Sequence, residues 1–208
     1  MTHTLDVFLD SDLKIVAQIV MPIQHCLVTK AKNLQDVRRL YTHPQALGQC
    51  RGWRQRNVPQ AEVIETSSTT RAAELAAKEE GSAAIASSLA AETYDLEILE
   101  RDLQDNPDNV TRFLVLGRKC GTPTGNDRTS LMFSVRDEVG ALHRALSVFH
   151  SASINMTKIE SRPSRKKAWE YFFFVDIDGH EQDQTVAEAI ESLREICDFI
   201  KVLGSYPL

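Results

Sequence analysis

Residues 130–161, SLMFSVRDEVGALHRALSVFHSASINMTKIES, decide the fold of the second half of this 208-residue chain. The apolar run at 130–137 predicts a strand, and the pattern at 140–152 predicts a helix. A second strand is predicted at 154–161. One face of the predicted helix carries Leu142, Leu146 and Phe149. The order strand, helix, strand is the first half of a split β-α-β unit.

The remainder of this half completes the unit. The run WEYFFFVDID at 169–178 predicts a third strand, and DFIKVLGSYP at 198–207 predicts the last one. Between them, residues 185–197 predict a second helix. The inward face of that helix carries Val186, Ile190, Leu193 and Ile196. The resulting order, βαββαβ, predicts a ferredoxin-like fold.

A break in composition separates this fold from the first half of the chain. Residues 119–130, KCGTPTGNDRTS, lack hydrophobic periodicity and are typical of a linker, so we expect domains at 1–118 and 131–208. Upstream, strands and helices alternate, which predicts an α/β layer with a largely parallel sheet. The strands are expected at 13–23, 25–29, 61–66, 82–87 and 96–100, and the helices at 33–41, 67–81 and 89–94. The first of these helices would place Leu34, Val37, Leu40 and Tyr41 on one face.

The composition limits the classes of partner. The chain is mildly acidic, with a net charge of −5, and we identify no basic block that could follow a phosphate backbone, so nucleic acid is not expected. The chain begins without a signal-peptide pattern, and no apolar run approaches the roughly 20 residues of a membrane span. This predicts a cytoplasmic protein with no membrane partner. Metal-site spacing is absent around the cysteines, so we expect free thiols and neither a metal nor a cofactor. The cysteines are Cys26, Cys50, Cys120 and Cys197.

Two polar stretches of the second half could together bind an amino acid. In RDEVGALHRAL, Gly140 stands near a helix N-terminus, where backbone N–H groups can hold a carboxylate. In NMTKIESRPSR, Glu160, Ser161 and Arg162 leave the end of a strand and Pro163 stops it. Glu160 or a carbonyl oxygen could hold an ammonium group there. Taken alone, Gly140 more simply makes a turn, and the second stretch could be a solvated loop.

Two polar stretches of the first half present the same choice. In DNVTRFLVLG, residues 108–117, Thr111 and Arg112 stand directly before an apolar run. They could cap an ordinary edge strand or belong to an active site. Ser67, Ser68 and Thr69 begin a predicted helix, where hydroxyl and N–H groups favour anions, but taken alone they form a simple N-cap.

The motifs GALH, INMTKIESRPSR and WEYFFFVDIDG resemble the ACT domain of prephenate dehydratases and of the aromatic amino-acid hydroxylases. The resemblance covers about 129–208. It implies a regulatory domain that binds phenylalanine as an effector at a dimer interface. The positions it implies for this site are Gly140, Ala141, Leu142, Asn155, Glu160, Ser161, Arg162 and Pro163.

The first half distinguishes these two relatives. HPQALGQC, SSTTRAAELAA, AAIASSLAAETYDL and DNVTRFLVLG resemble prephenate dehydratase, and the six histidines offer no convincing set for the iron of a hydroxylase. The whole chain is therefore identified as a member of the prephenate dehydratase family. This implies a partial, periplasmic-binding-protein-like, two-lobed α/β catalytic domain before the ferredoxin-like ACT domain. Arogenate dehydratase fits the motifs equally.

The resemblance also implies roles for the polar residues of the first half. Prephenate loses its ring hydroxyl and a carboxylate together, and Thr111 would hydrogen-bond the departing oxygen. Arg112 would supply fixed positive charge or brace the site, and Phe113 would pack. Ser67, Ser68 and Thr69 would contact the substrate, although Thr70 stands where the family has Ala.

The resemblance begins at residue 2, inside the family's fold. An upstream lobe with Gly-Pro-x-Gly-Thr and Glu-Asn-Ser stretches is expected in the family and is not among these 208 residues. Strand 110–116 would then present an unpaired apolar edge. Two functions stay open: a dehydratase, completed by a separate polypeptide or represented here in part, and a phenylalanine-binding regulatory module with an inert catalytic remnant.

Overall fold

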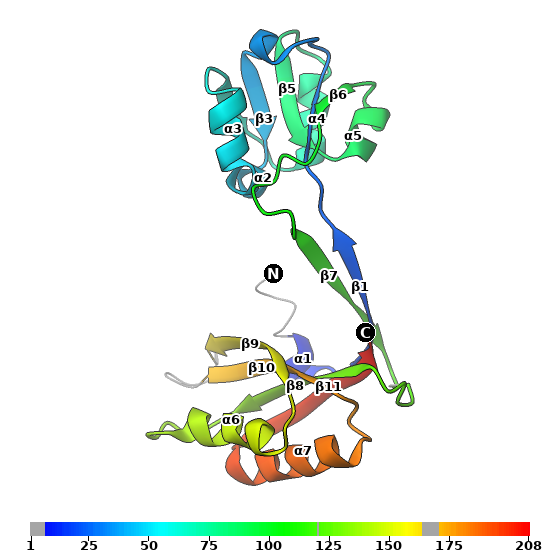
Figure 1. The fold of residues 1–208 in the computed structure, drawn as a ribbon, viewed down its shortest axis with the longest axis vertical. Coiled ribbons are helices and arrows are strands. Elements are labelled where there is room, and N and C mark those ends of the chain that lie inside the picture. Colours follow the sequence, from blue (N-terminus) through cyan, green and yellow to red (C-terminus); the bar gives the residue numbers. More distant parts are fainter. Residues whose placement is uncertain (1–6, 120, 164–170) are drawn as a thin grey trace. The chain divides into compact units, whose positions relative to one another are not determined.

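The structure, a computed structural model, describes residues 7–119, 121–163 and 171–208 and divides into two compact units (Figure 1). The discontinuous unit joins Met1–Val20 to Arg112–Leu208, and the continuous unit is Met21–Thr111. The chain leaves the first unit within β1 (Lys14–Pro22) and returns within β7 (Val110–Gly117). The sequence predicts domains and a linker in chain order, at 1–118, 119–130 and 131–208, whereas the two compact units are defined by packing. The sequence-derived boundaries stay a prediction.

The discontinuous unit contains a four-stranded antiparallel sheet in the order β11-β8-β10-β9. Its strands are β8 (Asp127–Ser134), β9 (Met156–Pro163), β10 (Tyr171–Asp178) and β11 (Phe199–Pro207). Helix α6 (Ala141–Ser151) follows β8, and α7 (Gln184–Ile196) follows β10. This element order confirms the predicted βαββαβ fold. Strand β8 starts four residues before the predicted domain start at residue 131, because Asp127 already pairs with Pro207 of β11.

Both helices cover one face of this sheet (Figure 1). The predicted inward faces are confirmed: α6 buries Phe149, and α7 buries Val186, Ile190 and Leu193. They pack on strand residues of the same core, and the Phe133 and Phe173 rings stack there with centroids 5.5 Å apart. The strand members of this core are Leu131, Phe133, Val175 and Ile177.

The N-terminal segment packs with the second core of this unit. Helix α1 (Val7–Asp10) and β1 contribute Phe8 and Ile15 to it. The sheet contributes Met132, Phe174, Leu203 and Tyr206. Lys201 Nζ donates to the carbonyl oxygens of Phe8 at 2.8 Å and Ser11 at 2.9 Å, which anchors α1 to β11.

The continuous unit is a five-stranded sheet in the order β4-β3-β5-β2-β6. Its strands are β2 (Cys26–Thr29), β3 (Arg39–Thr42), β4 (Glu62–Glu65), β5 (Ser82–Ala86) and β6 (Glu97–Glu100). The largely parallel sheet predicted from the alternation is confirmed except at β2, since β3, β4, β5 and β6 run in the same direction. Strand β3 is parallel to β4 and β5, but β2 is antiparallel to β5 and β6.

The reversal of β2 accompanies an error of the sequence prediction at residues 33–41. Residues 33–41 form no α-helix but the 3-10 turn η1 (Leu34–Asp36) and then β3. A parallel return needs a crossover of a dozen or more residues, whereas a short turn reverses the chain. Leu34, Val37 and Leu40 still enter one core, while Tyr41 enters the core on the other face of the sheet.

Helices cover both faces of this sheet, as expected of an α/β layer. They are α2 (Pro44–Gln49), α3 (Arg51–Asn57), α4 (Thr69–Ala76) and α5 (Ser88–Thr93). Alanines of α4 and α5 pack on one face, and Ala46 of α2 and Trp53 of α3 pack on the other. Small side chains let α4 approach β5 closely, which fixes the position of its N-terminus.

Candidate active site and effector site

Strand β7 carries the Thr-Arg-Phe stretch, and β1 is its hydrogen-bonded partner. Within the described residues β7 pairs with β1 alone, so one edge of strand 110–116 has backbone partners and its other edge has none, in line with the predicted unpaired apolar edge. Several apolar side chains of this pair stay exposed, although Ile15 of β1 is buried. The exposed ones are Ile19, Val20, Met21, Val110, Phe113, Val115 and Leu116.

Strand alternation separates the three side chains of this stretch. Thr111 and Phe113 project to one face of β7 and Arg112 to the other. Thr111 is half-buried, and Phe113 is 48% exposed. Arg112 therefore works in a different environment from the hydroxyl next to it in the chain.

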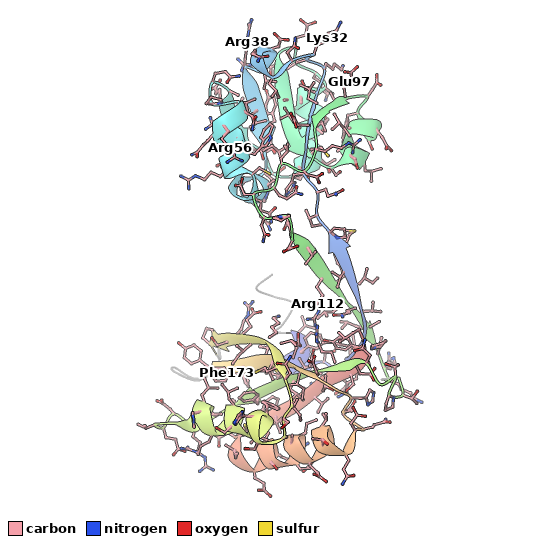
Figure 2. All side chains as sticks on the ribbon, in the orientation of Figure 1. Lys32, Arg38, Arg56, Glu97, Arg112 and Phe173 are labelled. Atoms are coloured by element: carbon pink, nitrogen blue, oxygen red, sulfur yellow. The ribbon has the colours of Figure 1, made fainter. Side chains whose placement is uncertain are left out.

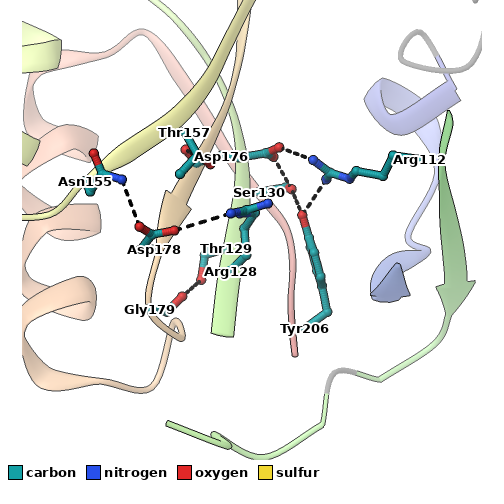
Figure 3. A network of polar contacts seen from close by, with 10 residues as sticks. All are labelled: Arg112, Arg128, Thr129, Ser130, Asn155, Thr157, Asp176, Asp178, Gly179 and Tyr206. Atoms are coloured by element: carbon teal, nitrogen blue, oxygen red, sulfur yellow. Dashed lines mark hydrogen bonds and ion pairs between the residues drawn. The ribbon is translucent and has the colours of Figure 1, made fainter. Parts of the chain in front are cut away.

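Arg112 points at the four-stranded sheet of its own unit (Figures 2 and 3). Its Nη1 donates to Asp176 Oδ2 of β10 at 2.6 Å, and its Nη2 donates to the Tyr206 hydroxyl of β11 at 2.7 Å. The guanidinium carbon lies 5.7 Å from the centre of the Tyr206 ring. Of the two roles the sequence left open for Arg112, this geometry supports bracing.

Ser130 of β8 completes the cluster. Its hydroxyl donates to Asp176 Oδ1 at 2.5 Å and lies 2.8 Å from the Tyr206 hydroxyl oxygen. Ser130, Asp176 and Tyr206 are all at most 5% exposed. Burial, reinforced by the Asp176 charge, raises the pKa of Tyr206, so its phenol stays protonated near neutral pH. We call Arg112, Ser130, Asp176 and Tyr206 the arginine cluster.

The predicted substrate hydroxyls lie at the N-terminus of α4. Ser68 is the N-cap, and its Oγ accepts from the Arg71 backbone N–H at 3.0 Å. Ser67 is exposed, and Thr69 begins the helix and is half-buried. The capping role is thus confirmed, and contact with a substrate anion stays a prediction.

A polar cluster behind Thr111 was missed from the sequence. His25 Nε2 lies 2.7 Å from Gln49 Oε1, and Gln49 Nε2 donates to Asn109 Oδ1 at 3.1 Å. Ile23 N donates to Asn109 O at 2.8 Å, and the Asn109 side-chain Nδ2 donates to Ile23 O at 3.2 Å. A histidine at the entrance of the apolar run CLVT was the available signal. His43 and Gln45 of the HPQALGQC stretch form the N-terminus of α2, where His43 Nδ1 accepts from Gln45 N at 3.2 Å.

The predicted turn at Glu160 to Pro163 is instead strand. Strand β9 continues to Pro163, and its last four residues pair with β10. A proline is tolerated there because β9 is an edge strand. Alternation places Glu160 and Arg162 on one face and Ser161 on the other. These side chains cannot all face one pocket of this chain.

Glu160 holds a charge cluster on its face of β9. Arg162 Nη2 donates to Glu160 Oε1 at 2.6 Å, and Lys158 Nζ lies 3.2 Å from Glu160 Oε2. Burial raises the pKa of Glu160, but the hydrogen bonds from Arg162 and Lys158 outweigh burial, so this pKa lies below its usual value. The carboxylate is therefore charged at neutral pH.

The remaining effector positions separate into two ends of the sheet. Gly140, with φ +79°, caps the N-terminus of α6, where Ala141 is buried and Leu142 contributes to the core. At this end of the sheet, Phe172 of β10 stands opposite Ser134 of β8 on one side and opposite Arg162 of β9 on the other. Asn155 lies at the other end, where its Nδ2 donates to Asp178 Oδ2 at 2.9 Å. The structure thus groups Gly140, Ala141 and Leu142 with Arg162 and leaves Asn155 apart.

The described cysteine thiols have raised pKa values. Burial, aided by Asp105, raises the pKa of Cys50 to about 12, and burial and Asp198 raise that of Cys197 to about 11. Burial also raises the pKa of Cys26, and Cys120 lies outside the described residues.

In residues 7–119, 121–163 and 171–208, no three His, Cys, Asp or Glu side chains gather as a metal site would need. Across the same ranges, no helix has the length and apolar character that crossing a bilayer requires.

Comparison with known proteins places these sites in a family. A family profile described as prephenate dehydratase matches residues 1–121, and one described as ACT domain matches residues 129–195. The chain belongs to the prephenate dehydratase family. The four-stranded sheet with α6 and α7 is therefore its ACT domain, and the Thr-Arg-Phe strand lies in the region matched by the catalytic profile.

Three relatives define the extent of the match. The bifunctional chorismate mutase/prephenate dehydratase of Aquifex aeolicus is 51% identical over 205 residues, which cover 99% of this chain and 57% of the relative. The prephenate dehydratase of Lactococcus lactis subsp. cremoris is 39% identical and is covered to 74% of its length. A crystal structure of an Arthrobacter aurescens prephenate dehydratase in complex with L-Phe matches with a TM-score of 0.86 at 36% identity, covering 100% of this chain and 70% of that one. The chain thus spans little more than half of the Aquifex relative.

Proposed function

We propose that this chain carries the second lobe and the ACT domain of a phenylalanine-regulated prephenate dehydratase. The substrate would be prephenate and the product phenylpyruvate. The observation that carries the proposal is the match of the catalytic profile across residues 1–121, which includes the Thr-Arg-Phe strand. Membership of this family also supports a cytoplasmic location, as a proposal.

Thr111 is the residue proposed to act on the leaving group. In the reaction, the bond to the carboxylate carbon breaks and its electron pair enters the ring. The ring hydroxyl then leaves with its bonding electrons and takes up a proton, giving water, CO2 and an aromatic product. A Thr hydroxyl is too weak an acid to protonate the oxygen in water, so its contribution is a hydrogen bond to the departing oxygen in a desolvated site.

The N-terminus of α4 is the proposed binding site for one substrate carboxylate. Ser67 and Thr69 present hydroxyls beside the N-cap Ser68, and the dipole of α4 favours an anion there. Binding at this position would hold the substrate without stabilising the carboxylate that must be lost, which is what the decarboxylation requires.

The ACT domain is the proposed sensor for phenylalanine. The matching Arthrobacter protein was solved in complex with L-Phe. In this chain the predicted effector residues lie at opposite ends of the sheet, with Gly140 at one end and Asn155 at the other. A homodimer in which two sheets lie antiparallel side by side would bring these ends together, so we propose that effector binding requires a dimer.

Phenylpyruvate formation from prephenate, followed by its ultraviolet absorbance, tests the proposal. We expect Thr111→Ala to lower kcat by about 10²- to 10³-fold, the usual cost of one transition-state hydrogen-bond donor. Thr111→Ser keeps the hydroxyl and should retain most of the rate. Equal rates for Thr111→Ala and the native chain would contradict the assignment. An arogenate arm in the same assay identifies the substrate form.

A second candidate is a phenylalanine-binding module without turnover. It is favoured by the exposed apolar side chains of β1 and β7, such as Phe113 and Val115, which a catalytic strand would be expected to bury. Saturable phenylalanine binding by calorimetry, with no phenylpyruvate formed from prephenate or arogenate, would support this candidate.

A further inference from the structure

The arginine cluster joins the strand of Thr111 to strands β10 and β11 of the ACT sheet (Figure 3). Arg112 follows Thr111 directly, so its Cα is one virtual bond of about 3.8 Å away. Its two terminal nitrogens are held by Asp176 of β10 and Tyr206 of β11. Two acceptors on different strands fix the plane of the guanidinium as well as its position.

The cluster is a closed set of interactions rather than a surface ion pair. The side chain of Asp176 is 7% exposed and that of Arg112 is 25% exposed. Asp176 uses one oxygen for Arg112 and the other for Ser130, and Ser130 in turn contacts Tyr206. Loss of one member leaves another buried polar group without its partner, so the cluster is expected to act as a unit.

Strand β10 also contacts the predicted effector positions. Asp178, two residues after Asp176, accepts from the Asn155 side chain and lies 3.6 Å from Arg128. Strand β10 pairs directly with β9, where Phe174 stands opposite Glu160. A change of β9 on effector binding therefore reaches the backbone of Asp176 through one strand pairing.

We infer that Arg112 is a positioning residue: Asp176 and Tyr206 hold it in the ACT sheet, and through this contact the effector state of the ACT domain sets the position of Thr111. The inference rests on the proposed dehydratase function and deepens it. It assigns Arg112 to the regulatory sheet instead of to the substrate.

The chemistry makes such a contact consequential. The Thr111 hydroxyl acts only if it lies at hydrogen-bond distance from the departing oxygen, and misplacement by about 1 Å can cost on the order of 10²-fold in rate. A strand held at one side chain by two sheet strands can be shifted by that amount without unfolding. Feedback inhibition then needs no contact between phenylalanine and the substrate.

The test compares Tyr206→Phe and Asp176→Asn with the native full chain in three measurements. These are phenylalanine binding by calorimetry, hydrogen exchange of the amides of residues 111–116 with and without phenylalanine, and kcat and KM for prephenate. Tyr206→Phe keeps the buried ring, so it stays informative if Asp176→Asn fails to fold. Asp198→Asn is the matched control, since it removes an exposed carboxylate of the same domain that pairs with Arg136 at 3.0 Å.

We expect phenylalanine to change the exchange of residues 111–116 in the native chain and in the control, and to bind both variants with unchanged stoichiometry. In the variants the phenylalanine-dependent change in exchange should fall at least fivefold. Where turnover is present, kcat should fall about tenfold with KM changed less than twofold, and inhibition by phenylalanine should weaken. A merely structural role would lower stability and leave the phenylalanine-dependent difference intact.

The outcomes separate the inference from the function. Variants that bind phenylalanine and show the native response in residues 111–116 would overturn the inference, even if the chain is an active dehydratase. A chain without turnover whose residues 111–116 respond to phenylalanine through the cluster would support the inference and favour the phenylalanine-binding module over the dehydratase. An unresponsive native chain that binds phenylalanine would overturn the inference as well.

Discussion

The Tyr206 phenol accepts a hydrogen bond from Arg112 and contacts Ser130. Its ring packs in the second core of the discontinuous unit, the ACT unit, which contains the ACT domain. Its hydroxyl is therefore both a polar partner and part of an apolar environment. The two demands are compatible only while the phenol is protonated, because a phenolate beside the Asp176 carboxylate would place two negative charges in one buried site. The structural role of Tyr206 therefore requires the protonated phenol.

We predict that Tyr206 makes the protein sensitive to alkali. Its pKa is raised from 10.0 by burial and by Asp176, so the unfolded chain loses the phenol proton at a lower pH than the native one. The stabilisation is complete below about pH 10 and is lost as pH rises towards the higher native pKa. Urea unfolding of the native chain and of Tyr206→Phe between pH 8 and 11.5 measures this. Their difference in unfolding free energy should be constant to pH 9.5 and then shrink, and a constant difference throughout would refute the assignment.

Candidate site residues could be proposed from the sequence where the local pattern was unusual. Thr111 and Arg112 stood out because a hydroxyl and a guanidinium precede an apolar run. The direction of Arg112 was not predictable, since its partners lie 64 and 94 residues away along the chain. The same holds for the His25 cluster, whose link from Gln49 to Asn109 spans 60 residues.

At the level of elements, the ACT fold was predictable and the first half only in part. Long apolar periodicities in α6 and α7 have one interpretation, because 11- and 13-residue helices present several turns to the core. Leu34, Val37 and Leu40 have helical spacing too, but a 3-10 turn followed by a strand buries the same three side chains. Short segments therefore left the direction of β2 undetermined by pattern.

We predict that Gly204 in β11 is required for the packing of β1. Its φ is +147°, and an added Cβ would collide with the backbone of Ile15. Gly204→Ala should lower the unfolding free energy by about 2 to 4 kcal/mol, from backbone strain and overpacking together. Gly48→Ala is the control, because nothing lies within 4 Å of its Cβ position and alanine favours a helix by about 0.5 to 1 kcal/mol. Urea unfolding that ranks both variants equally would contradict this account.

At the scale of the whole molecule, the two units have separate cores. The ACT unit contains the cores around Phe133 and Phe174, and the continuous unit contains those around Val28 and Leu27 on the two faces of its sheet. The chain passes between the units only within β1 and β7. The packing of residues 7–20 in the discontinuous unit could not be predicted from composition, since it depends on contacts such as Lys14 Nζ to Val202 O at 2.6 Å.

Separate cores predict separate unfolding. Differential scanning calorimetry of the full chain should show two transitions, and phenylalanine should raise only the one that belongs to the ACT unit, because a ligand stabilises the unit whose folded form it binds. At 100 times the Kd the gain is about 2.7 kcal/mol for that unit. Trp53, buried in α3, assigns the transitions: in Trp169→Phe it is the remaining one of the two tryptophans, so its fluorescence follows the continuous unit alone. A Trp53 transition that moves with phenylalanine as far as the other would show that the units unfold as one, and the coupling through β1 and β7 would then extend beyond the arginine cluster.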